Sequence, residues 1–145
     1  MNSNEQVLQN MARIAQSGRD FFTDIYPRVL SSEVRTAFAY VADVKSRLLR
    51  DLAPWVPHIE RSEDRTSPAA TVEKMYDDAR KAFRGDVPAP VAHALGFGEA
   101  QLCKLLQRAF DESDSPALKQ MLKSYYAELL ICRQAMWRLH ARLAA

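Results

Sequence analysis

The sequence predicts an all-α bundle of four long helices, because apolar residues recur at spacings of three and four along most of its 145 residues. Prolines fall between the periodic segments, at Pro27, Pro54, Pro88 and Pro116. β-branched residues are scattered, and no run alternates apolar and polar residues between two turns. We therefore expect helices packed around one core in a single domain, residues 1–145.

The first two predicted helices form a hairpin. Pro27 ends the first helix, and Ser31 or Ser32 caps the second, which continues to about residue 52. The two apolar stripes consist of Leu8, Met11, Ala15, Gly18, Phe22 and Ile25, and of Val34, Phe38, Val41, Lys45, Leu48 and Leu52. Lys45 is thus a cation within an otherwise apolar stripe.

The second half of the chain predicts another hairpin. Residues 53–70 contain three prolines and a charged run, so we expect a long connection there, followed by a short amphipathic helix over 71–84 outside the main core. The third long helix is predicted over 89–111, and the fourth begins just before Pro116. Helices of about 20 residues span about 30 Å, so a connection of this length can cross the bundle between the two hairpins.

Composition excludes several function classes. The net charge is +2 and no long basic run occurs, so neither nucleic acid nor an anionic membrane is an expected partner. The 4 glycines form no phosphate-binding loop, and no apolar run is long enough to span a membrane. The first residues lack the features of a signal peptide, which predicts a cytoplasmic protein in which Cys103 and Cys132 are buried free thiols.

Two short stretches resemble a known family. Ser17-Gly18-Arg19-Asp20-Phe21-Phe22 resembles the glycine-phenylalanine stretch in the first helix of small bacterial ferritin-like proteins, the YciF-like and related stress families of unknown function. Gly98-Glu99 is similar to the Gly-Glu of that family's third helix. The resemblance implies a ferritin-like four-helix bundle of two hairpins joined by a long crossover. It also implies a di-iron site built from inward carboxylates and Glu-x-x-His motifs.

The residues themselves predict that such a site is incomplete. No Glu-x-x-His occurs in the sequence, and the acids of the first helix project to solvent. The inward polar set is Lys45, Glu99 and Glu128. In one interpretation, Glu99 and Glu128 are a remnant carboxylate pair that binds a cation or works with Lys45 in acid–base chemistry. In the other, the two glutamates lie at the flanks of their stripes and Lys45 extends to the rim of the bundle. Burial of all three together would instead indicate an ion pair.

We expect no catalytic residues, no metal ligands and no cofactor. The histidines, His58, His93 and His140, are scattered along the chain. Cys132 lies in the middle of its stripe, about two turns from His140, so no histidine activates it as a nucleophile.

The fourth long helix carries a second apolar line about 120° around from its main stripe. This line consists of Tyr126, Leu130 and Trp137, with Arg133 beside it. Either the 71–84 helix and Trp55 cover this line, or it is the interface of a homodimer or of another protein partner.

Three functional hypotheses follow. The first is a non-enzymatic, stress-related ferritin-like bundle that lacks a complete di-iron site and acts through surface or dimer contacts. The second is a metal-binding relative with an altered site at Glu99 and Glu128. The third is an unrelated helical adaptor.

Overall fold

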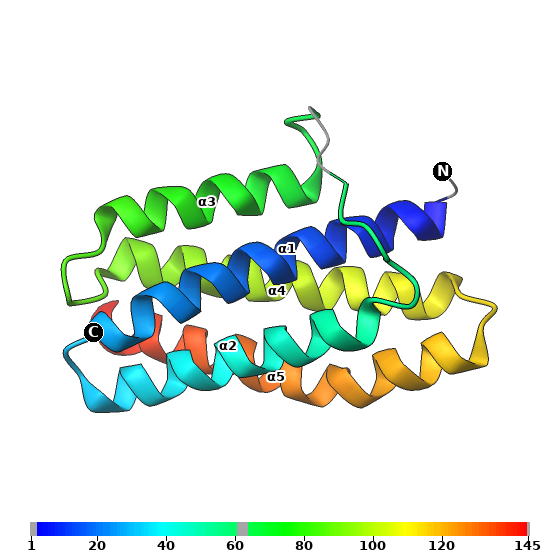
Figure 1. The fold of residues 1–145 in the computed structure, drawn as a ribbon. Helices are drawn as coiled ribbons and strands as arrows, with labels where there is room; N and C mark the ends of the chain where they lie inside the picture. Colours follow the sequence, from blue (N-terminus) through cyan, green and yellow to red (C-terminus); the bar gives the residue numbers. More distant parts are fainter. Residues whose placement is uncertain (1–2, 61–63, 145) are drawn as a thin grey trace.

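The computed structural model describes residues 3–60 and 64–144, and this part of the chain contains helices and no strands. The all-α prediction is confirmed. In order, the elements are α1 (Ser3–Ile25), the short 3₁₀ turn η1 (Tyr26–Arg28), α2 (Ser32–Leu52), α3 (Pro68–Ala82), α4 (Ala89–Glu112) and α5 (Pro116–Ala144) (Figure 1).

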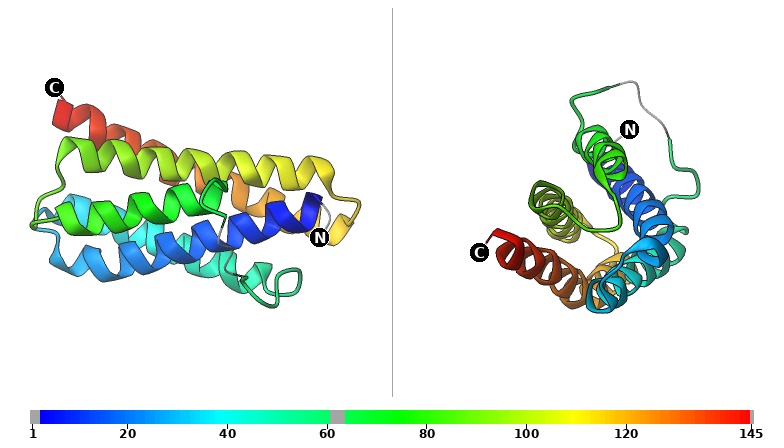
Figure 2. Two further views of the ribbon diagram at one scale, coloured as in Figure 1. Left: turned by 90° about the horizontal axis from the view of Figure 1, so that it is seen from above. Right: turned by 90° about the vertical axis from the view of Figure 1, so that its left-hand side faces the viewer.

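The four long helices pack as two hairpins. Helix α1 pairs with α2 and α4 pairs with α5, while α1 also packs against α4 and α2 against α5. Among the four long helices, those in contact run in opposite directions, and the diagonal pairs are α2 with α4 and α1 with α5 (Figures 1 and 2). After α2 the chain returns along the bundle, because α3 runs in the same direction as α1. This return lets α4 run parallel to α2.

Helix α3 packs against α1 and α4 and contributes to the core. The expectation that it lies outside the core is therefore wrong: Ala69, Val72, Tyr76 and Ala79 are all buried. Tyr76 has a relative exposure of only 2 %, since its ring enters the space between α1 and α4. The prediction fails because the side chain of Tyr76 is long enough to enter the space between α1 and α4.

Serine caps mark the beginnings of α2, α3 and α5. The hydroxyl oxygen of Ser31 accepts a hydrogen bond from the backbone N–H of Val34 at 3.3 Å, and that of Ser115 accepts from Leu118 at 3.2 Å. Ser67 does the same for Ala70 at 3.1 Å, so α3 begins at Pro68 rather than at residue 71 as predicted. The Ser-Pro pair at 67–68 repeats the signal at 115–116, where a serine N-cap precedes proline in the first helical turn.

An aromatic cluster occupies the centre of the core. The rings of Phe22 and Phe38 meet edge to face with centroids 5.0 Å apart, and those of Phe21 and Tyr76 lie 5.3 Å apart. These contacts join α1, α2 and α3 around the level of Lys45, whose ammonium lies 5.7 Å from the centroid of the Phe22 ring. Such aromatic pairs stabilise a core beyond the area that they bury.

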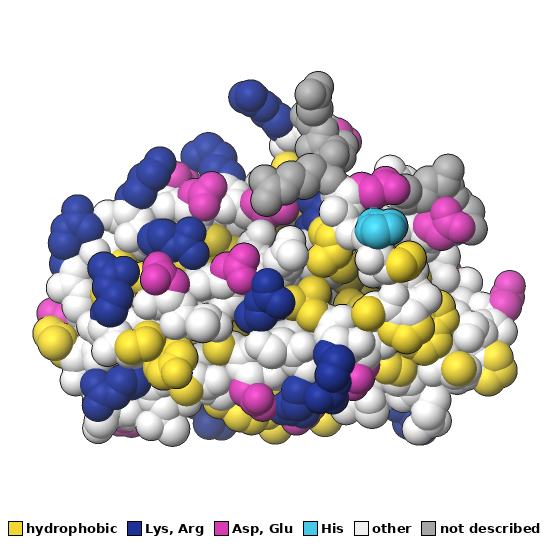
Figure 3. Space-filling model, viewed as in Figure 1, with side chains coloured by type: hydrophobic (Ala, Val, Ile, Leu, Met, Phe, Trp, Pro, Cys, Tyr) yellow, Lys and Arg dark blue, Asp and Glu magenta, His cyan; other side chains and the backbone are white. Residues whose placement is uncertain are grey.

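Positive and negative side chains are intermingled over the face that α1, α2 and α3 present (Figure 3). Ion pairs such as Arg19–Asp20 and Lys74–Asp78 are exposed to solvent. None of the described helices is long and apolar enough to cross a membrane.

Candidate functional site

Lys45 and Glu99 form an ion pair in the middle of the bundle. Lys45 comes from α2 and Glu99 from α4, and their side chains have relative exposures of 0 % and 1 %. The Lys45 ammonium donates hydrogen bonds to both carboxylate oxygens of Glu99, with Nζ–O distances of 2.5 and 2.6 Å. Lys45 therefore does not extend to the rim. Because the pair is removed from water, leaving either charge without the other would be strongly unfavourable.

Two glycines make room for Lys45 and for Tyr76 beside it. A Cβ atom at Gly18 of α1 would lie 2.5 Å from Cε of Lys45 and 3.0 Å from the hydroxyl of Tyr76. A Cβ atom at Gly98 of α4 would lie 3.2 Å from the same hydroxyl. Both glycines thus have a physical role: they let a lysine and a tyrosine enter between helices.

Tyr76 is a further polar group at this centre. Its hydroxyl has no hydrogen-bond partner among the described residues. Burial raises the pKa of Tyr76 well above its ordinary value, and the Glu99 carboxylate raises it further. The phenol is therefore neutral at physiological pH. Helical spacing puts Tyr76 on the same face as Val72 and Ala79, and the signal for its deeper position was the pair of glycines on other helices.

Glu128 does not join this pair. Arg47 of α2 donates to its two carboxylate oxygens at 2.9 and 3.0 Å, and the two side chains are 32 % and 30 % exposed. Arg47 also donates to Asp43 one turn away, and the hydrogen bonds to Glu128 and Asp43 raise the pKa of the guanidinium. Of the three polar residues that sequence analysis grouped, Lys45 and Glu99 meet, while Glu128 belongs to a separate, half-exposed link between α2 and α5.

The two thiols lie close to the buried pair. Cys103 and Cys132 are free and buried, in α4 and α5. Burial raises the pKa of Cys103 to about 11 and that of Cys132 to about 12. Both thiols are therefore protonated and shielded at neutral pH, which makes them poor nucleophiles.

Helix α4 itself covers the second apolar line of α5. The indole of Trp137 lies against Gly96, where an added Cβ atom would be 3.3 Å from the ring. The hydroxyl of Tyr126 accepts a hydrogen bond from Gln107 at 2.9 Å. Trp137, Tyr126 and Leu130 remain half-buried, and Arg133 is exposed. Of the two alternatives for this line, cover by the 71–84 helix is wrong, because α3 packs on α1 and α4 and makes no contact with α5.

Two histidines that looked scattered in the sequence meet beside Trp137. The rings of His93 and His140 lie with their centroids 5.0 Å apart. They are 47 residues apart in the chain, and antiparallel pairing of α4 with α5 brings them to the same level. Helical periodicity alone gives no signal for this contact, because it does not state which levels of two helices face each other.

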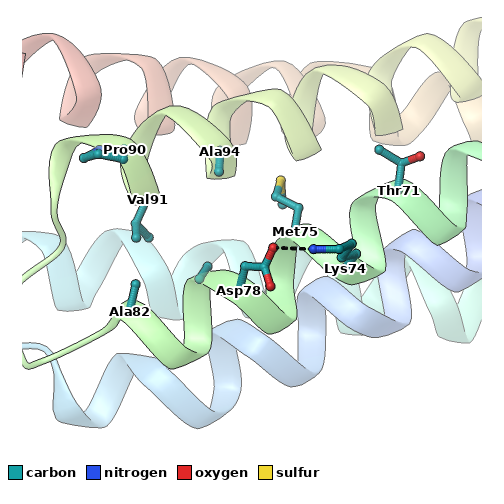
Figure 4. A pocket seen from close by; sticks show the side chains of 9 residues that line it. Thr71, Lys74, Met75, Asp78, Ala82, Pro90, Val91 and Ala94 are labelled. Atoms are coloured by element: carbon teal, nitrogen blue, oxygen red, sulfur yellow. Dashed lines mark hydrogen bonds and ion pairs between the residues drawn. The ribbon is translucent and has the colours of Figure 1, made fainter.

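Two grooves lie between helices. One of about 400 Å³ separates α3 from the first half of α4, with Met75 pointing toward α4 and the Lys74–Asp78 ion pair at its edge (Figure 4). A second, of about 620 Å³, lies between α4 and α5 beside Phe110, Asp111 and Lys123. Both are lined mainly by apolar atoms.

The described residues contain no group of three or more His, Cys, Asp or Glu side chains placed to hold a metal ion. Taken together, the fold and the centre define an all-helical protein whose core is organised around one buried ion pair. Comparison of the chain with protein-family models, curated proteins and solved structures finds no match.

Proposed function

We propose that this protein is a non-enzymatic ferritin-like bundle of the bacterial stress type, with the Lys45–Glu99 pair in place of a metal centre, and that it acts through its surface as a homodimer. The path of the chain supports the ferritin-like plan. Two antiparallel hairpins are joined by a segment that returns along the bundle, so that α2 and α4 run in the same direction.

The buried Lys45–Glu99 pair carries the non-enzymatic part of this proposal. A di-iron centre of this class requires several inward carboxylates and two histidines. Here the inward carboxylate of Glu99 is neutralised by the ammonium of Lys45, and Glu128 is bound by Arg47. The residues present therefore do not fit a di-iron centre. They do not favour the altered site at Glu99 and Glu128 either, since each carboxylate faces a different cation.

Metal analysis tests this point. Tag-free protein is incubated with Fe(II) under anaerobic conditions, desalted and analysed for iron, with Glu99→Gln as the matched variant. We expect far less than one iron per chain in both proteins and no iron oxidation above the rate in buffer. Stoichiometric iron that disappears in Glu99→Gln would overturn the proposal.

The outer face of the α4–α5 hairpin supports the dimer. Its groove is lined by Asp111 of α4 and Lys123 of α5, which lie at the same level of the hairpin. A two-fold axis along the groove places α4 of one copy over α5 of the other, so Asp111 faces Lys123 of the second copy twice. Apart from the buried Glu99, α4 has as many cationic as acidic residues, whereas α5 carries five cationic residues against one acidic residue. Pairing α4 of one copy with α5 of the other therefore keeps the two positively charged α5 helices apart.

Solution mass tests the dimer. Sedimentation from 1 to 100 µM should give twice the chain mass of 16.5 kDa. Asp111→Lys and Lys123→Asp should each weaken association and the double variant should restore it, while Lys81→Asp on α3, an exposed position away from this face, should have no effect. A monomer at all concentrations, or a dimer indifferent to both charge reversals, would overturn this part.

A further inference from the structure

The His93–Trp137–His140 cluster lies at the end of the bundle where α4 begins and α5 ends. His93 is exposed and His140 is half-buried, so solvent reaches the pair. The planes of the two imidazoles are inclined at 60°. The Trp137 ring lies 5.8 Å from His93 and 6.0 Å from His140, between centroids, and meets both edge to face.

The separation of the rings matches that of two imidazoles bound to one metal ion. A metal bonded to an imidazole nitrogen at about 2.0–2.1 Å lies roughly 3.2 Å from the ring centroid. Two centroids 5.0 Å apart then subtend an angle of about 100° at the metal. This angle lies between the square-planar and tetrahedral values, which are the geometries that Cu(II), Ni(II) and Zn(II) adopt with nitrogen ligands.

The packing around the cluster holds the two ligands in place. Trp137 rests on Gly96, one turn from His93, and His140 lies one turn after Trp137. The indole therefore fixes the spacing of α4 and α5 at this level. Ligands supported by rigid helices bind more tightly than ligands on loops, because less order is lost on binding.

We propose that His93 and His140 form a two-imidazole site for a late first-row divalent metal, with Cu(II) bound most tightly. Imidazole nitrogens favour such ions over Mg²⁺ and Ca²⁺, and affinity rises toward Cu(II). Water or an external ligand completes the coordination, so the site is open. The site is separate from the Lys45–Glu99 pair and does not depend on dimerisation.

Fluorescence of Trp137 provides the test. The chain has 2 tryptophans, so a tag-free protein with Trp55→Phe emits from Trp137 alone. We expect CuCl₂ to quench this emission saturably with one ion per chain. His93→Ala and His140→Ala should each weaken binding by about tenfold or more. His58→Ala, which removes an exposed histidine from the connection between α2 and α3, should leave the titration unchanged.

Two further measurements make the result specific. The paramagnetic resonance spectrum of the Cu(II) complex should show coupling to two imidazole nitrogens, and each single histidine variant should show one fewer. Thermal unfolding of the histidine variants without metal checks that they remain folded. Quenching that rises linearly with added copper, or that is unchanged in both histidine variants, would overturn the proposal. The iron analysis described under Proposed function tests only the Lys45–Glu99 centre, so its result and the result for the two-histidine site can be told apart.

Discussion

Removing one partner of the Lys45–Glu99 pair should destabilise the protein far more than removing both. Each side chain is at most 1 % exposed, so the remaining charge in Lys45→Met or Glu99→Met has no access to water. Breaking a buried pair in this way costs about 3–5 kcal/mol, whereas replacing both partners by apolar residues of similar volume is often neutral or stabilising. We expect each single variant to lose about 3 kcal/mol and the double variant to lie within about 1–2 kcal/mol of the natural sequence.

Urea unfolding followed by far-ultraviolet circular dichroism at pH 7 measures these free energies. The exposed pair Lys74–Asp78 on α3 is the matched control, because its side chains are 78 % and 59 % exposed at an N–O distance of 2.9 Å. Lys74→Met should change stability by less than about 0.5 kcal/mol, as is usual for a surface pair. Costs below about 1 kcal/mol for both single core variants, or strictly additive costs in the double variant, would refute the reasoning.

Two other predictions concern the same region. Gly18→Ala should lower stability by about 1–3 kcal/mol although alanine is the better helix former, because its Cβ would lie 2.5 Å from Cε of Lys45; an unchanged or raised melting temperature would contradict this. Burial raises the pKa values of Cys103 and Cys132 from 9.0 to about 11 and about 12, so the unfolded chain loses these protons first and stability falls as pH rises above about 9. The loss at pH 10 should be roughly 1 kcal/mol per thiol. It should be smaller in Cys103→Ala/Cys132→Ala, as urea titrations at pH 8 and pH 10 would show.

The helices and most of their ends follow from the amino-acid sequence alone. Local signals suffice for this, because a serine cap, a proline and a period of 3.6 residues act within one or two turns. The same signals placed Lys45 within the apolar stripe of its helix but left open whether its ammonium is buried or extends to the rim. Ser67-Pro68 also signals the start of α3, although the other prolines of this segment favoured a connection that continues to residue 70.

Which inward groups meet depends on how the helices pack against one another. Glu99 and Glu128 both belong to the inward polar set, yet Lys45 pairs with Glu99 because α4 lies diagonally across from α2, while Glu128 on the adjacent α5 faces Arg47. The depth of Tyr76 and the contact of His93 with His140 likewise depend on the level at which one helix packs against another. That level is set by the fit of side chains across the whole interface, which no periodicity within a single helix records.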